Sequence, residues 1–328
     1  MQCHTITWHQ ALLAGLLLFW PQAILGARAI TSKLPANKNI KPCAQTTSTP
    51  DDAGAQDELH EALITAIKRN HTRPITALLA DGTNPNYTPA GKEHLINLAA
   101  ALEDPAILIL LLEHGADPQR ACTSSNSPLH IAVGYLRQEQ LQLILALGLD
   151  PNMQAFHNAT PLHDAVDHSF LAGVLLLLLA EARPNAANKF SQTPLYRAVQ
   201  LHNQFKDKAS KRMCMRSIIE LLLLAGSDPD IHDDKSNTPH TIAQDSALKA
   251  RLATGTSTPS DTAQLHALIT ASSILDNQPE IKALLDAPKV PEKYAALIAK
   301  LGAPATKERR DSGSSTDSPT RSTSTTPT

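Results

Sequence analysis

Apolar residues between positions 57 and 252 fall in short runs dominated by leucine and alanine, which favour helices over strands. The runs are of two kinds. One begins with a hydroxyl residue, a proline and a leucine, whereas the other is richer in leucine and is apolar on all sides between 174 and 180. A helix that is apolar all round needs neighbours to cover it. The pattern therefore predicts an all-α chain of stacked helix pairs.

The starts of the first helices recur at a fixed interval. Ser-Pro-Leu or Thr-Pro-Leu begins at positions 127, 160 and 193, that is, every 33 residues. A second motif keeps the same interval, with Gly-Ala-Asp-Pro at 115, Gly-Leu-Asp-Pro at 148 and Glu-Ala-Arg-Pro at 181. A fixed period of this length is typical of a stacked repeat array.

Each position of these motifs has a local physical reason. Ser127, Thr160 and Thr193 are expected to cap their helices, because a side-chain oxygen there accepts a hydrogen bond from an unpaired amide. The following prolines take the first helical position, where no amide hydrogen is needed. Glycine suits the left-handed backbone at a helix end. Glu181 stands where the other repeats have glycine, so its turn should be strained or anchored by another group.

The two motifs in one register resemble the ankyrin repeat, whose signature is a Thr-Pro-Leu-His start and a Gly-Ala-Asp end. The resemblance covers residues 57–252. It implies an all-α solenoid of about six to seven helix–turn–helix repeats with hairpin-like turns, degenerate caps included. It also implies that His130 and His163 hydrogen-bond the backbone and tie neighbouring turns, and that protein recognition is the usual task.

The period continues beyond the clear copies. Gly82 lies one period before Gly115, which predicts a first pair of helices at 58–70 and 74–80. Thr238 follows Thr193 by one period plus 12 residues, so an insertion falls within 202–217, in the loop joining the two helices of that repeat. The insertion is basic. An anionic partner could use it, or it could be a solvated helix extension.

The flanks divide by composition. Residues 30–56 read as a flexible leader, and 253–261 as a linker rich in Thr, Ser and Pro. Residues 262–304 predict further helices, a degenerate repeat or a helical cap that shields the end of the array. The Ser/Thr/Pro tail at 305–328 has nothing to bury and should be disordered.

The first 29 residues are expected to form a signal peptide. An apolar run at 11–20 is followed by Ala27-Arg28-Ala29, a small-residue cleavage pattern. Export would take the chain to the periplasm or outside the cell of a bacterium; an uncleaved anchor or a mispredicted start are the alternatives. Cleavage would leave Cys43, Cys122 and Cys214, of which the sequence does not choose a pair.

No pattern points to chemistry. The formal net charge of −2 gives no long-range attraction to nucleic acid or to an anionic membrane. No Gly-rich phosphate loop, nucleophile elbow or zinc-protease motif occurs in the sequence. We therefore expect no enzyme activity, no cofactor and no metal. The alternative is an enzyme or metal-binding protein that uses the C-terminal helices, which would require a cluster of buried titratable groups.

The turns and first helices should form one concave wall to which a partner protein binds. Exposed aromatic rings beside charged groups have the composition of binding hot spots. The predicted partner-binding residues are Tyr87, Ile131, Tyr135, Phe156, His157, Asp164, Asp167, His168, Lys189, Phe190, Arg197 and Asp234. Phe156 or Phe190 could instead pack onto a neighbouring turn.

The sequence thus predicts a monomeric, non-enzymatic module for protein–protein interaction. The alternative of the same class is a dedicated periplasmic inhibitor or protective partner of one protein. Fold does not fix the partner.

Overall fold

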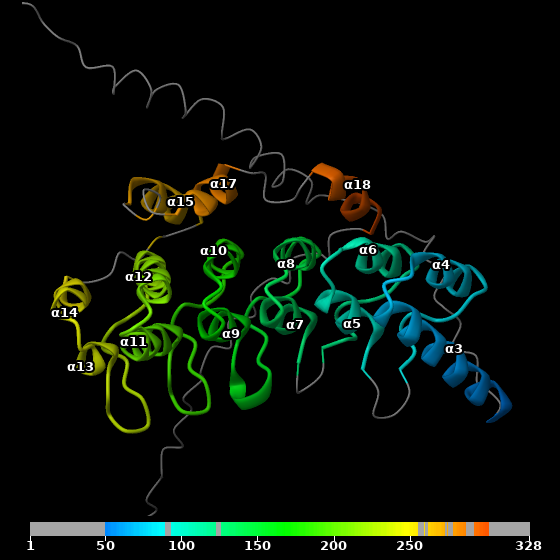
Figure 1. Ribbon diagram of the computed structural model, residues 1–328, viewed down its shortest axis with the longest axis horizontal. Helices are drawn as coiled ribbons and strands as arrows, with labels where there is room; N and C mark the ends of the chain where they lie inside the picture. Colours follow the sequence, from blue (N-terminus) through cyan, green and yellow to red (C-terminus); the bar gives the residue numbers. More distant parts are fainter. Residues whose placement is uncertain are drawn as a thin grey trace, which may run out of the picture. The chain divides into compact units, whose positions relative to one another are not determined.

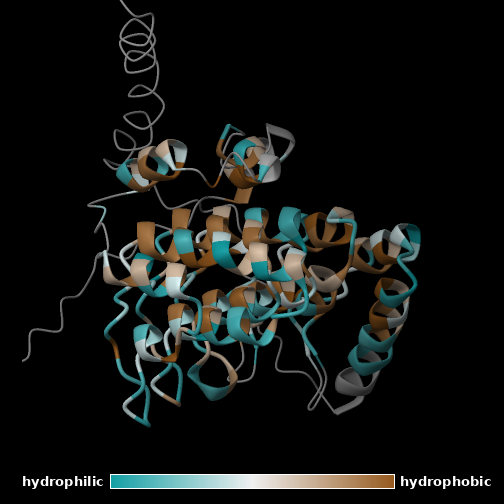
Figure 2. Cartoon of the chain, turned by 60° about the vertical axis from the view of Figure 1, so that its left-hand side comes forward, coloured by the Kyte–Doolittle hydropathy of each residue, from teal (hydrophilic) through white to brown (hydrophobic). Residues whose placement is uncertain are grey.

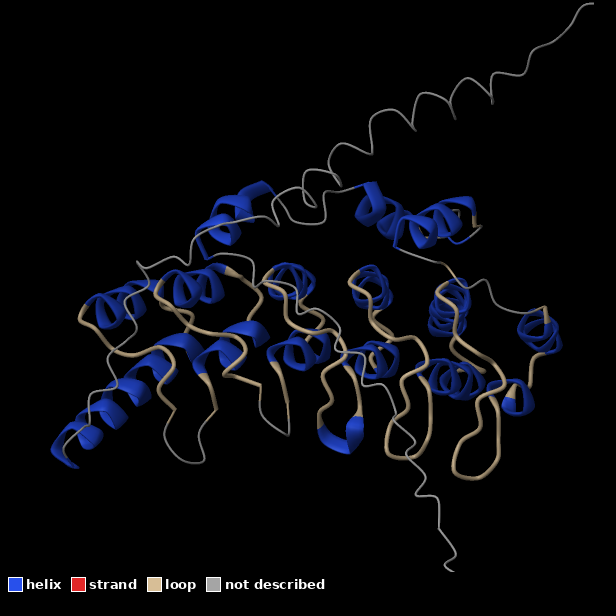
Figure 3. Cartoon of the chain, turned by 180° about the vertical axis from the view of Figure 1, so that it is seen from behind, coloured by secondary structure: helices blue, strands red, loops and turns tan. Residues whose placement is uncertain are grey.

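The computed structural model describes the central part of the chain and several C-terminal segments. The described residues are 50–88, 93–122, 126–254, 259, 262–272, 274, 278–286 and 292–301. They form helices and turns, with no strand among them (Figure 3). The predicted signal peptide and the predicted tail at 305–328 lie outside this part. From Asp52 onward the described helices belong to one compact unit.

Six helix pairs follow one another along the described chain (Figure 1). The pairs are α3 (Pro50–Lys68) with α4 (Thr72–Ala80), α5 (Leu95–Ala101) with α6 (Ala106–Glu113), α7 (Pro128–Gly134) with α8 (Gln138–Ala146), α9 (Pro161–Asp167) with α10 (Leu171–Leu179), α11 (Pro194–Gln204) with α12 (Ala209–Leu224), and α13 (Pro239–Ile242) with α14 (Ser246–Ala253). From α5 to α13 the first helices contact one another in order, and so do α8, α10 and α12. The result is two layers of helices, and the predicted all-helical repeat solenoid is confirmed.

The helix starts follow the capping chemistry of the sequence. The Ser127 hydroxyl accepts from the His130 amide, and the Thr193 hydroxyl accepts from the Tyr196 amide at 3.2 Å. Proline takes the first turn of α7, α9, α11 and α13. α3 begins at Pro50, eight residues before the predicted helix start at 58.

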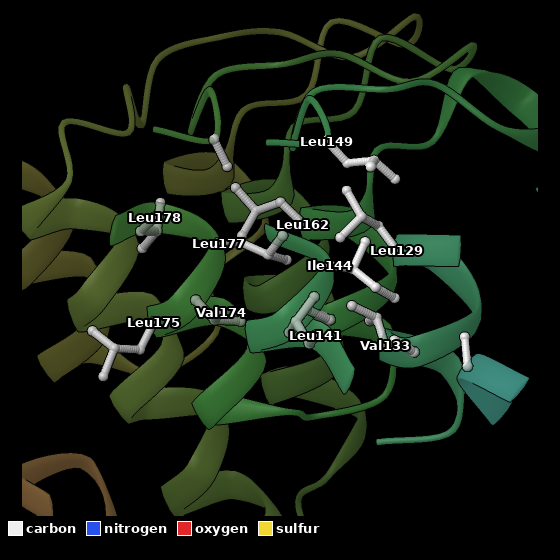
Figure 4. Close-up of a cluster of buried hydrophobic side chains, with 14 of the residues drawn as sticks. Leu129, Val133, Leu141, Ile144, Leu149, Leu162, Val174, Leu175, Leu177 and Leu178 are labelled. Atoms are coloured by element: carbon white, nitrogen blue, oxygen red, sulfur yellow. The ribbon is translucent and has the colours of Figure 1, made fainter. Parts of the chain in front are cut away.

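The core lies between the two layers of helices and is continuous from one pair to the next. Leu129 and Val133 of α7 meet Leu141 and Ile144 of α8, while Leu162 of α9 lies beside Leu177 of α10 (Figure 4). These side chains are fully buried. No pair encloses a core of its own, so each repeat depends on its neighbours for burial.

The turn after α10 contains the expected exception and its anchor. Glu181 has φ 66°, where the equivalent Gly148 and Gly226 have φ 81° and 88°. Asn152 of the preceding turn stabilises the turn at Glu181 through two hydrogen bonds. Its side-chain oxygen accepts from the Arg183 amide at 2.6 Å, and its amide donates to the Glu181 carbonyl at 3.4 Å. The turn is therefore both strained and anchored.

The same bridge recurs elsewhere in the array. Asn86 accepts from the Asp117 amide and donates to the Gly115 carbonyl, and Asn185 makes the equivalent bonds to Asp228 and Gly226. An asparagine at this repeat position ties one turn to the next.

The insertion is helical rather than a loop. α11 has 11 residues and α12 has 16, where α9 and α10 have 7 and 9. Nearly all the extra residues lengthen these two helices, because their polar and charged side chains leave the array and need only solvent. A loop was predicted between the two helices, whereas the structure has helix on both sides of a short connection at 205–208.

The C-terminal helices cover the second-helix layer instead of the end of the array. α15 (Thr262–Ala271) contacts α10 and α12, α17 (Pro279–Asp286) contacts α10, and α18 (Glu292–Leu301) contacts α6. Figure 1 shows them beside that layer. The physical reason is the composition of α6 and α10, which are apolar on all sides and need a cover on their outer face. The predicted cap over the array's end is thus a cover along its side.

Candidate interaction surface

Finger-like turns project from the array between consecutive helix pairs (Figure 1), and three of them are described along their whole length. We call them finger A (147–160), finger B (180–193) and finger C (225–238). A backbone hydrogen bond closes each of them, from Ala155 to Ala159 at 2.8 Å, from Asn188 to Gln192 at 3.0 Å and from Asp233 to Asn237 at 2.9 Å. Figure 2 shows mostly hydrophilic colours along these turns and hydrophobic ones on the helices. The fingers are therefore polar hairpin-like projections.

Backbone hydrogen bonds also join each finger to the next. The Lys189 amide donates to the His157 carbonyl at 2.9 Å, and the Asp234 amide donates to the Phe190 carbonyl at 3.3 Å. These are equivalent positions in successive fingers. The Ser191 hydroxyl adds a bond from finger B to the Asp234 carboxylate. The three fingers thus form one tied wall.

An aromatic cluster lies across fingers A and B. It consists of Phe156, His157 and Phe190. The His157 ring lies 3.8 Å from the centre of the Phe156 ring and 5.6 Å from that of Phe190, which it meets edge-on. The Lys189 ammonium lies 5.1 Å from the Phe190 ring centre. Both phenylalanines stay open to solvent, with exposed fractions of 67% and 44%. Contact with His157 therefore uses part of each phenylalanine ring and leaves the rest exposed.

Charged side chains lie on α9 and α11, the first helices that follow fingers A and B. Arg197 of α11 pairs with Asp167 of α9 at 2.9 Å, and it donates to the Gln200 side chain at 2.7 Å. His168 bonds the Asp164 carbonyl at 2.8 Å through its side chain. Partial burial and the neighbouring Asp167 carboxylate raise the pKa of the Asp164 carboxyl to about 6. This helix face is a polar network between two repeats.

The other three predicted residues lie apart from the aromatic cluster. The Tyr87 hydroxyl donates to the Asp57 carboxylate at 2.6 Å, and its ring meets the ring of His60 at 6.0 Å, so Tyr87 packs on α3. Ile131 is half-buried against the core. Tyr135 ends α7 with 57% of its surface exposed. Of the four aromatic residues expected on one wall, Phe156 and Phe190 alone share a described ring contact, which each makes with His157.

The two histidines of the start motif have the structural role that the resemblance implied. His130 bonds the Ser127 hydroxyl through Nδ1 at 2.7 Å and the Ala159 carbonyl through Nε2 at 3.2 Å. His163 repeats this arrangement with Thr160 and with the Gln192 carbonyl at 3.0 Å. Each histidine ties its helix start to the base of the next finger.

The third copy of the motif replaces histidine by Tyr196. Burial and a hydrogen bond to the Asp233 carboxylate raise the pKa of the Tyr196 hydroxyl to about 12. Asp233 also accepts from the amides of Lys235 and Asn237 and so shapes finger C. We did not predict this role. The signal was present, because Asn188 at the equivalent position of finger B accepts from the amides of Phe190 and Gln192.

We expect His130 to make the fold sensitive to acid. Burial lowers the pKa of His130 to about 4, below the ordinary 6.5 that applies to the unfolded chain. Unfolding therefore takes up a proton below pH 6.5, and stability present above that pH is lost as the pH falls toward 4. Between pH 7 and pH 5, the unfolding free energy of wild type should fall by about 2 kcal/mol more than that of His130→Gln. Urea unfolding of both proteins at the two pH values measures this.

The comparison with wild type is needed because Asp164 acts in the opposite direction. Its raised pKa means that the folded chain gains stability relative to the unfolded chain as the pH falls through 6. Subtracting the wild-type change removes this contribution. An equal pH dependence in the variant and the wild type would contradict the assignment to His130.

Candidate chemistry outside the wall is sparse. Among the described residues, no group of three or more His, Cys, Asp or Glu side chains could hold a metal ion. Cys122 and Cys214 are both free and half-buried, and burial raises the pKa of each thiol. Cys43 lies outside the described residues. In the part of the chain that the structure covers, each helix is too short or too polar to cross a membrane.

Comparison with known proteins places the repeats in a family. Residues 96–188 match the family model of ankyrin repeats, in three copies. Among solved structures, the chain is similar to the crystal structure of the ankyrin repeat domain of Bcl-3, described as a unique member of the IkappaB protein family. That similarity has a TM-score of 0.51 and 23% identity, and it covers 58% of this chain and 81% of the other. No curated protein matches the chain. At this identity the solved structure informs the fold alone.

Proposed function

This chain is an ankyrin repeat protein, a kind of fold that generally serves protein–protein interaction, and on that premise we propose that it binds a partner protein through fingers A to C and the adjoining first helices. The observation that carries the proposal is the aromatic cluster, two open phenylalanine rings held across two tied fingers. Such rings beside charged groups have the composition of interface hot spots.

The fingers suit binding because they are already ordered. Hydrogen bonds between fingers A, B and C fix the backbone that carries Phe156 and Phe190. A surface fixed in advance loses little conformational entropy when a partner binds, so more of the contact energy contributes to affinity. Rings that are partly exposed also leave apolar area for the partner to bury.

The neighbouring helix face would set orientation. The Asp167–Arg197 pair and Gln200 form a polar group of fixed geometry on α9 and α11. Rim charges of this kind contribute more to specificity and association rate than to affinity. We therefore assign the apolar contact to Phe156 and Phe190, and orientation to Asp164, Asp167, His168 and Arg197. Binding with this surface requires no catalysis and no cofactor.

Export belongs to the proposal as well. Its support is the apolar run at 11–20 and the small-residue pattern that ends at Ala29. The partner would then be an envelope or extracellular protein, and a dedicated inhibitor of one such protein is the narrower form of the same idea. The bait for its capture is the mature chain from Ile30.

Replacing Phe156 and Phe190 by alanine should abolish capture of the partner from the native host. Their exposed rings contribute little to the fold beyond their contact with His157, so the unfolding free energy should fall by only about 1 kcal/mol. Affinity capture with the mature chain, followed by mass spectrometry, measures the first effect, and urea unfolding measures the second.

The control is Leu136→Ala, which removes an exposed apolar side chain (50%) from the turn between α7 and α8, outside the fingers. It should capture the same protein as wild type. If the double variant still captures the partner and the control variant does not, the interface lies elsewhere than on the fingers. A large loss of stability in the double variant would instead assign the rings to the fold.

A further inference from the structure

The insertion builds a basic extension, residues 205–216, at one end of α11 and α12. The fingers lie at the opposite end of this helix pair, because finger B leads into the start of α11 and finger C follows the end of α12. The extension exceeds what stacking requires, since the flanking pairs lack it. Its cationic side chains are all exposed: Lys206, Lys208, Lys211, Arg212 and Arg216. It is thus a separate surface from the fingers.

The charge of the extension opposes the stability of its own helix. Lys208 is the N-terminal flanking residue of α12, Lys211 and Arg212 follow in the first turn, and that turn contains no acidic residue. The N-terminus of a helix is the positive end of its dipole, where cations are unfavourable. Among the other second helices, α8 has Glu139 in its first turn and α14 is capped by Asp245, whereas α4, α6 and α10 have no acidic residue in the first turn. Fold stability therefore does not explain this arrangement.

Few opposite charges compensate the extension. Arg216 lies 3.8 Å from Asp245, and Asp207 is the single acidic residue within the extension. Within the described part of the chain, Lys206, Lys208, Lys211 and Arg212 make no ion pair. Lys211 lies over the half-buried Phe205 ring at 5.5 Å from its centre. The positive charge is therefore open to an external partner.

One buried histidine next to the extension, His202, has no described hydrogen-bond partner for its ring nitrogens. His202 is 3% exposed, and neither ring nitrogen has a hydrogen-bond partner within the described structure. Burial lowers the pKa of His202, and Arg216 and Arg212 lower it further, while Asp245 opposes them. The positive charge of the extension therefore affects the protonation of the buried His202 side chain. A bound anion near these arginines would raise the pKa of His202.

We propose that the basic extension is a second interaction surface, which binds an acidic segment of a partner protein. The four unpaired cations match carboxylates, and the exposed Met213 beside them adds the apolar contact common at protein interfaces. Nucleic acid fits less well, because base recognition on single strands needs open aromatic faces and Phe205 is half-buried under Lys211. This surface acts independently of the fingers.

The test uses a fluorescent oligoglutamate peptide and the full chain, with anisotropy read at low and high salt. We expect binding at low salt that weakens as salt screens the charges. The triple variant Lys208→Glu, Lys211→Glu, Arg212→Glu should bind at least about tenfold more weakly. Its thermal midpoint should be unchanged or higher, because acidic residues suit the first turn of a helix. A neutral version with glutamine at the three positions should fall between the two.

The matched control changes the charge equally at another exposed place: Lys68→Glu, Arg69→Glu, Arg73→Glu, at the junction of α3 and α4. It should keep wild-type binding, and so should the Phe156/Phe190 double variant. In wild type and the control, the peptide should raise the pKa of His202 measured by NMR. Absence of binding at low salt, an equal loss in the control, or equally tight binding of oligothymidylate would each overturn the proposal.

Discussion

Leu177→Asp should leave the chain without a cooperative unfolding transition. Leu177 is fully buried on α10, between the two helix layers and beside Leu162 of α9 (Figure 4). An aspartate there would lose the leucine packing and place an unpaired carboxylate among apolar side chains. Together these cost more than about 5 kcal/mol, the scale of the whole stability of a small domain. Far-UV circular dichroism and urea titration measure the loss.

The effect should extend beyond one repeat. α10 contacts α8, α9, α12, α15 and α17, so its failure removes burial from both sides of the array and from the C-terminal cover. The matched control is Leu177→Met, an apolar replacement of similar volume, which should cost less than about 1.5 kcal/mol. A folded and soluble Leu177→Asp protein would mean that the register of α10 is wrong.

The parts of the fold that could be predicted depend on local chemistry repeated at a period. A hydroxyl cap, a proline and an inward leucine define a helix start within three residues, and three copies remove the ambiguity that one would have. The asparagine bridges could have been found in the same way. Asn152 and Asn185 are one period apart, and Asn86 lies two periods before Asn152. The bonds of Asn152 anchor the turn at Glu181 that the motif left unexplained.

The C-terminal helices could not be placed because no period connects them to the array. Their sequence predicts amphipathic helices but not which face of the array they cover. The deciding information lies elsewhere, in the all-round apolar character of α6 and α10. Similarly, the basic extension was located by counting residues, but its helical form depends on α11 and α12 already being helices that can lengthen.

The candidate surface was predicted in part. Phe156, His157 and Phe190 meet because equivalent finger positions stack one period apart. Tyr87 was placed on the same wall by the same register, but Asp57 and His60 of α3 hold it. The repeat register predicts the position of a residue on the backbone, but it does not predict which neighbouring residues its side chain contacts. Binding by these residues stays a prediction until the alanine variants are tested.

A chain that ends at Thr254 should be markedly less stable than one that ends at Leu301. The shorter chain loses α15, α17 and α18, whose buried side chains belong to the same core as the array: Leu265, Ile269, Ile281, Leu285, Tyr294 and Leu297. It also loses the bond from the Tyr294 hydroxyl to the Glu139 carboxylate of α8 at 2.8 Å. Half-buried leucines of the second-helix layer, such as Leu110 and Leu176, would face water.

We expect a net loss of roughly 3 kcal/mol or more, because each apolar side chain returned to water costs about 1.5 to 3 kcal/mol before chain entropy offsets part of it. Urea unfolding and binding of an apolar dye measure the loss and the exposed surface. The point substitution Ile269→Asp should reproduce it, whereas Thr270→Asp, one residue along on the exposed side of α15, should not. If the chain ending at Thr254 unfolds at the same urea concentration and binds no dye, the second-helix layer needs no cover. The apolar outer faces of α6 and α10 would then have to serve another contact.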